Sequence, residues 1–228
     1  MHFDQLRRRE FITLLGGAAA AWPLAVYAQQ PARLRRIGVL MSVAADDPRA
    51  NVHLAGLRDG LERLGWVEGS TLHIEYRFAG GNPDQFSVLA KELIAFHPEV
   101  IFAQSTPVAA ALQRETRAIA IVFVEVSDPI GSGFIASLAR PGGNLTGMIQ
   151  YEPGIAGKWV AMLKEIAPSL ARVALLANPK GTAYDYFLRN ATAAASSLGI
   201  EIISSPVDNV ADLDVPASLL VRADEVLE

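Results

Sequence analysis

The chain contains no cysteine. This absence excludes disulfide bonds, thiolate metal ligands, a cysteine nucleophile and a lipid-bearing N-terminal cysteine. An excess of positive charge is also missing, because 20 Lys and Arg residues stand against 24 Asp and Glu residues, for a formal net charge of −4. Without a basic face, nucleic acid is not an expected partner. The hydrophobic content of 51% nevertheless supports a folded core.

Catalytic and metal-binding patterns are missing as well. The sequence has neither a P-loop nor a Gly-x-Ser-x-Gly elbow. Residues 131–136 match a loose dinucleotide pattern, but Ser127-Asp128-Pro129 separates them from the preceding strand. The sequence has four histidines, and His2 lies within the N-terminal segment of residues 1–28. His53, His73 and His97 lack the spacing of metal ligands, and we expect these three at the surface or its boundary. The sequence therefore predicts no catalytic residue, no metal and no cofactor.

The N-terminus predicts a secretory signal peptide over residues 1–28. Three arginines precede a short apolar stretch, and small residues lead to an expected cut after Ala28. A transmembrane anchor is the alternative, but the apolar stretch is shorter than the roughly 20 residues of a span, and Pro23 interrupts it. Arg8-Arg9 followed by Phe11 resembles a twin-arginine export signal, which carries folded proteins. We therefore expect a periplasmic protein.

The remainder alternates apolar strands with amphipathic helices. Strands are expected at 37–41, 72–76, 100–103, 119–126, 145–149, 173–177 and 200–203. Helices are expected at 54–64, 86–94, 106–116, 155–166 and 183–198, with a weak helix at 133–138. This alternation predicts an α/β fold with a parallel sheet flanked by helices. We divide it into a complete first lobe (35–150), a partial second lobe (151–208) and a C-terminal tail (209–228).

Candidate ligand-binding residues follow three of the expected strands. They lie at carboxyl strand ends, where open α/β sheets bind ligands: Ser42, Gln104, Ser105, Thr106, Ser127 and Asp128. Hydroxyls and N–H groups at a helix start suit a carboxylate, and Asp128 suits an amino group. Thr106 is also the expected N-cap of a helix that has Pro107 at its first position. The alternative is that Thr106 and Asp128 only cap a helix and a turn.

A family resemblance runs through nearly the whole chain. The motifs that carry it are Arg8–Phe11, Ile37–Leu40, Gly56–Leu61, Leu64–Gly69, Ile74–Arg77, Ser127–Pro129, Arg140–Gly147 and Pro216–Glu228. With these motifs the chain resembles the ABC transporter substrate-binding proteins of the type I periplasmic-binding fold, in the tryptophan- and tyrosine-type subgroup. The resemblance implies a non-enzymatic protein that binds an amino acid or small organic solute in an interlobe cleft. It also implies first-lobe contacts from Ser42, Ser105, Thr106 and Asp128, and an ABC permease in the inner membrane as partner.

The chain departs from this family in length. Two lobes of this kind need about 100–150 residues each, and residues 151–208 are too few for the second. The sequence therefore looks internally deleted near residues 209–215, where the partial lobe runs into the family's tail. We expect the first lobe to fold and ligand affinity to be weak or lost. The alternatives are a truncated, non-binding remnant and an exported α/β enzyme.

Overall fold

The computed structural model describes residues 34–152 and 154–207. The predicted signal peptide, the C-terminal tail and the suggested deletion point all lie outside the described residues. Within the described ranges, no helix combines the length and the apolar character that crossing a bilayer requires.

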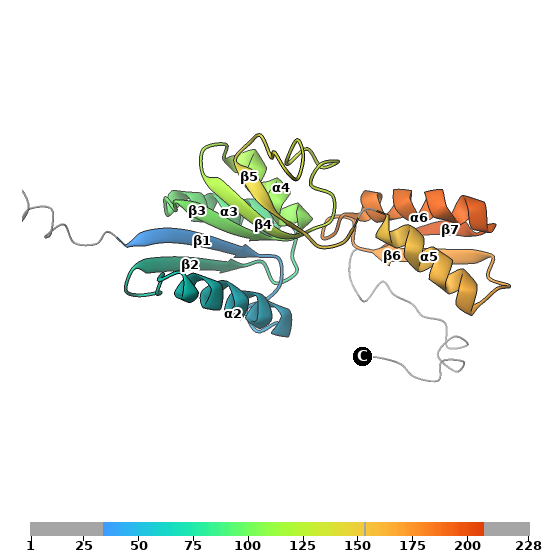
Figure 1. Ribbon diagram of the computed structural model, residues 1–228, viewed down its shortest axis with the longest axis horizontal. Helices are drawn as coiled ribbons and strands as arrows, with labels where there is room; N and C mark the ends of the chain where they lie inside the picture. Colours follow the sequence, from blue (N-terminus) through green and yellow to red (C-terminus); the bar gives the residue numbers. More distant parts are fainter. Residues whose placement is uncertain (1–33, 153, 208–228) are drawn as a thin grey trace, which may run out of the picture.

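Five parallel strands form the larger sheet, sheet A, in the order β2-β1-β3-β4-β5 (Figure 1). The strands are β1 (Arg35–Met41), β2 (Leu72–Phe78), β3 (Val100–Gln104), β4 (Ala120–Val126) and β5 (Leu145–Ile149). Each is a short, mainly apolar run, as expected where helices cover a parallel sheet. The predicted parallel sheet flanked by helices is therefore confirmed.

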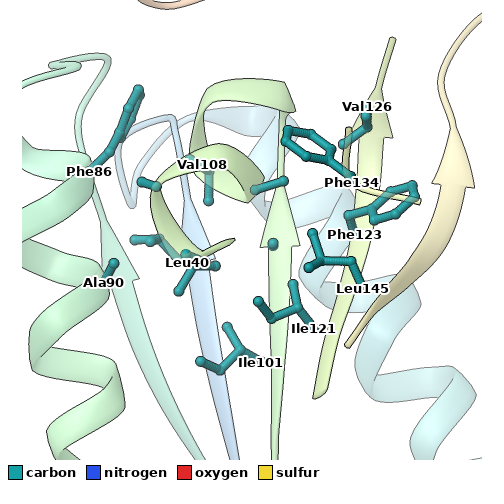
Figure 2. Packing of buried hydrophobic residues seen from close by; sticks show 14 of the residues in the cluster. Leu40, Phe86, Ala90, Ile101, Val108, Ile121, Phe123, Val126, Phe134 and Leu145 are labelled. Carbon is teal, nitrogen blue, oxygen red and sulfur yellow. The ribbon is translucent and has the colours of Figure 1, made fainter. Parts of the chain in front are cut away.

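Three helices cover sheet A from two sides. Helix α2 (Pro48–Arg63) packs against one face, and α3 (Gln85–Ala95) and α4 (Thr106–Glu115) pack together against the other. Side chains alternate between the faces of a strand, so Leu40 of β1 joins the α3–α4 core while Val39 and Met41 join the α2 core. Figure 2 shows Leu40 in the α3–α4 core among the buried side chains of the neighbouring strands.

The second lobe is smaller and contains two strands among the described residues. Its elements are α5 (Ile155–Ile166), β6 (Arg172–Ala177), α6 (Tyr184–Leu198) and β7 (Glu201–Pro206). Strands β6 and β7 pair in parallel as sheet B, and α5 packs closely on α6. Gly157 permits this approach, because a Cβ there would stand 2.9 Å from the Ala194 methyl group. The described chain passes between the sheets once, from β5 to α5.

The weak helix predicted over residues 133–138 is wrong. This segment forms turns, because nearby acceptors take its amide groups: Phe134 and Ile135 N–H both donate to the Pro129 carbonyl, at 2.9 and 3.3 Å. Phe134 and Ile135 are buried in the α3–α4 core. Their apolar character reflects this burial rather than a helical face.

Candidate ligand-binding site

Ser42 and Gln104 lie where the order of sheet A changes direction. The chain moves from β1 to β2 on one side and from β3 to β4 on the other, so the switch point lies between β1 and β3. At this point the Ser42 amide and hydroxyl both donate to Gln104 Oε1, at 2.9 and 2.6 Å. Gln104 is buried. Two predicted site residues are therefore brought into direct contact.

The network continues to two residues that the sequence analysis did not select. Gln104 Nε2 donates to Glu125 Oε2, and Glu125 Oε1 lies 3.2 Å from His53 Nε2. Glu125 has a φ of 55°, and the β4–β5 register shifts between Phe123 and Val126. Such irregularities occur beside functional sites, where they redirect a side chain. The available sequence signal was that Glu125 is the single charged residue in β4.

Thr106 was expected to be the N-cap of its helix, and this expectation is wrong. Thr106 is the first residue of α4, while Ser105 occupies the cap with a φ of 89° and no side-chain capping bond. The Thr106 hydroxyl instead accepts a hydrogen bond from the Ser127 amide at 3.1 Å, which joins the loops after β3 and β4. Because Thr106 makes this bond to another loop, it holds two parts of the predicted site together.

Three buried polar atoms at this end of the molecule have no hydrogen-bond partner within residues 34–152 and 154–207. They are His53 Nδ1, Ser105 Oγ and the Tyr186 hydroxyl. Buried polar groups are normally paired, so unpaired groups suggest positions for a ligand or for water. Ser105 was among the predicted residues, whereas Tyr186 comes from α6 in the second lobe.

Asp128 links the two lobes. Its Oδ1 accepts a hydrogen bond from the Gly131 amide at 2.8 Å, and its Oδ2 lies 3.5 Å from Arg189 Nη2 of α6. An added Cβ at Gly131 would overlap the Asp128 carboxylate, so a larger residue at this position displaces the carboxylate. The bond to Gly131 matches the turn-capping alternative, and the Arg189 contact shows that the carboxylate also faces a cation.

Two cavities border these residues. Ser127 and Asp128 line one of about 60 Å³, together with Tyr151 and Tyr186. Small-molecule pockets usually measure about 300–1,000 Å³, so this cavity is smaller than a typical ligand pocket in the arrangement that the structure shows. The other cavity measures about 280 Å³ and lies between the start of α2 and the end of β4, beside Glu125.

The larger cavity is bordered by ionised groups. At its edge the pKa of Asp47 is lowered, mainly by the hydrogen bond from the Arg49 side chain, and the pKa of Arg49 is raised by the same bond. Both groups therefore stay charged at neutral pH. No cluster of His, Asp and Glu with the makings of a metal site occurs in the part of the chain that the structure describes.

The fold and the convergent loops define a two-lobed α/β protein with its candidate site at the switch point. The profile of the family described as ABC transporter substrate binding protein matches residues 36–226, and the chain belongs to this family. Its members are solute-binding proteins rather than enzymes.

Individual relatives agree with this assignment. The chain is 23% identical over 193 residues to the tyrosine-binding protein of Clostridioides difficile (strain R20291), a match that covers 85% of this chain and 55% of the relative. A conserved domain protein from Vibrio cholerae is 29% identical, with a TM-score of 0.71 and coverage of 79% and 60%. An ABC domain from Streptococcus pneumoniae in complex with L-Trp is 23% identical, with a TM-score of 0.69 and coverage of 79% and 59%.

These structures share the type I periplasmic-binding fold with this chain. The chain spans only a little more than half the length of the relatives it matches. The comparisons thus support the predicted family and fold.

Proposed function

We propose that this chain is the solute-binding component of an ABC importer and that it binds an amino acid or small organic solute between its lobes. The observation that carries the proposal is the convergence of the loops after β1, β3 and β4 at the switch point of sheet A. This is where open α/β sheets bind ligands. The unpaired Ser105 Oγ and Tyr186 hydroxyl add a polar atom from each lobe.

The site chemistry favours a ligand that carries both a carboxylate and an amino group. The start of α4 and the unpaired Ser105 hydroxyl provide donors for a carboxylate. Asp128 provides an acceptor for an ammonium group. That group would take the place of Arg189, whose Nη2 lies 3.5 Å from Asp128 Oδ2. Tyr151 and Tyr186 add aromatic surface next to Asp128. An aromatic amino acid combines these features, and the names of the C. difficile and S. pneumoniae relatives refer to such ligands.

Export to the periplasm is part of the same proposal. Its support is the sequence of residues 1–28, with paired arginines, a short apolar stretch and small residues up to Ala28. A solute-binding protein in the periplasm would deliver its ligand to an ABC permease in the inner membrane. Cell fractionation, combined with N-terminal sequencing of the product, tests both the location and the cut. A cytoplasmic product that retains residues 1–28 contradicts this part of the proposal.

We further propose that the second lobe is shortened by an internal deletion near residues 209–215. The family profile extends to residue 226, yet the chain covers only 55% of the C. difficile relative. Sheet B has two strands among the described residues, whereas sheet A has five. A second lobe of this size offers fewer ligand contacts, which favours weak affinity and keeps a truncated, non-binding remnant as the alternative function.

Thermal unfolding of the full chain with a panel of amino acids and small carboxylates tests binding. A ligand at 100 times its dissociation constant stabilises the folded form by about 2.7 kcal/mol. Gly131→Ala should weaken the response because it displaces the Asp128 carboxylate. Gly143→Ala is the matched control, since its Cβ meets no neighbour. A response to no ligand supports the remnant, and an equal response in both variants excludes Asp128 from the site.

A further inference from the structure

Helix α5 carries an exposed apolar stripe that the proposed solute site does not use. Trp159, Met162, Leu163 and Ile166 follow the spacing i, i+3, i+4 and i+7, which places them on one helical face. Their exposed fractions run from 40% for Trp159 to 79% for Ile166. A contiguous apolar face of this kind usually marks a contact surface. We call these four residues the α5 stripe.

An apolar cavity adjoins the α5 stripe. It measures about 170 Å³ and lies between α5 and sheet B, with Trp159, Leu163 and Val173 among its lining residues. Apolar cavities near 150 Å³ stay dry and accept a benzene-sized group, so this one suits a single apolar side chain. Among the described residues β6 pairs only with β7, which leaves the other edge of β6 without a strand. The stripe and the cavity share Trp159 and Leu163, and the described residues leave the edge of the neighbouring strand β6 without a partner.

We propose that residues 215–228 of this chain cover the α5 stripe and place an apolar side chain, Leu219 or Leu220, in the cavity. The last described residue before the segment, Val207, lies beside β6, because its amide donates to the Ala177 carbonyl at 3.1 Å. Strands lie about 4.8 Å apart and an extended residue spans about 3.3 Å. Leu219 follows Val207 by twelve residues, a length that crosses sheet B with ample margin.

In sheet A the chain follows a path that illustrates this placement. There the chain runs from β1 to β2 and then returns to pair on the other side of β1, giving the order β2-β1-β3. Sheet B repeats the first two steps as β6 and β7. A return of the same kind, made without a helix such as α3 of sheet A, would bring the following segment to the open side of β6, beside helix α5 and the cavity.

Charge favours this segment over a second copy of the chain. Helix α5 and strand β6 contain Lys158, Lys164 and Arg172 against the single acid Glu165, and Glu152, which pairs with Lys158, adds one more acid beside them. Residues 215–228 contain Asp224, Glu225 and Glu228 against the single cation Arg222. The segment therefore brings the opposite net charge, whereas a second α5–β6 surface brings the same charge. Opposite charge promotes association and like charge opposes it.

Trp159 fluorescence tests the proposal in the full chain. The other two tryptophans, Trp22 and Trp66, are replaced by Phe so that Trp159 alone reports. We expect blue-shifted emission with weak acrylamide quenching, both lost when Leu219 and Leu220 are changed to Asp. Changing Ala217 and Ser218 to Asp is the matched control, which adds the same charge to the same segment but removes no large apolar group. Emission that is unaffected by the Leu219→Asp/Leu220→Asp change overturns the proposal.

Engineered disulfides test whether residues 215–228 or a second copy of the chain covers the α5 stripe. Because the chain has no native cysteine, only the introduced cysteines can form a disulfide. The pair Met162→Cys with Leu220→Cys should form an intramolecular disulfide much faster than Val52→Cys with Leu220→Cys. Val52 is a fair comparison because it is 71% exposed on α2. Equal rates in the two pairs overturn the proposal, and so does a covalent dimer formed by Met162→Cys alone. These substitutions lie at exposed or terminal positions, and circular dichroism checks that each variant folds.

Discussion

Replacing Gln104 with Leu keeps a similar side-chain volume but removes the amide that joins the ends of β1, β3 and β4. In the structure Gln104 Oε1 accepts two hydrogen bonds from Ser42, and Nε2 donates one to Glu125. A buried polar group that loses its partner costs about 1–3 kcal/mol. The Ser42 hydroxyl can turn toward water, and the Glu125 carboxylate is 27% exposed and keeps His53. We therefore expect a loss of about 2–3 kcal/mol, mainly from the Ser42 amide.

Urea unfolding followed by far-UV circular dichroism measures this loss as a lower midpoint with an unchanged slope. Gln113→Leu is the matched control, because Gln113 makes one hydrogen bond at the surface, to the Gly133 carbonyl, and should lose about 1 kcal/mol or less. A double-mutant cycle with Ser42→Ala should give a coupling energy of at least about 0.5 kcal/mol. A Gln104→Leu loss no larger than the Gln113→Leu loss, or a coupling near zero, refutes the reasoning.

Three further predictions concern stability. Glu125→Gly should be more stable than Glu125→Ala by about 1 kcal/mol in urea unfolding, because both lose the carboxylate but only Ala retains the strain of a φ of 55°; equal stabilities would rule out strain. The Arg77 hydrogen bond holds the pKa of Glu75 below its usual 4.5, so its contribution is present above pH 4.5 and is lost as the pH falls through the folded value. Arg77→Met should flatten this acid limb by at most about 1 kcal/mol in a pH series, and a steeper limb would contradict the assignment. Leu112→Ala should cost about 2–5 kcal/mol because Leu112 is fully buried, against about 0.5 kcal/mol or less for the exposed Val52→Ala; similar losses would contradict the packing described.

Local sequence patterns predicted most elements because those elements depend on local chemistry. The helix at 155–166 was predicted with the bounds that the structure shows, since Pro153 and Pro168 flank a clear amphipathic period. The prediction of a helix at 133–138 was wrong because Phe134 and Ile135 pack into a core formed by residues that are distant in the sequence. An apolar run of that length carries no information about which neighbour will bury it.

The sequence predicted only the part of the candidate site that depends on the order of the strands. Ser42 and Gln104 meet because parallel strands bring their carboxyl ends to one edge, a rule that needs only the order of elements. Glu125 was missed because an irregularity in β4 turns its side chain toward Gln104, and regular alternation along a strand does not reveal such a shift. Tyr186 and Arg189 depend on how the second lobe packs against the first, which no local pattern encodes.

The single passage between the two sheets has a consequence for how a solute would be held. Because the described chain crosses from sheet A to sheet B once, the proposed site would receive Tyr186 and Arg189 as groups tethered to the first lobe by one segment. Their contribution then depends on an effective concentration set by the connecting segment, which is in the millimolar range for short flexible linkers. Stiffening the segment between β5 and α5 while keeping Tyr151 would therefore change solute affinity, although every side chain proposed to touch the solute stays in place.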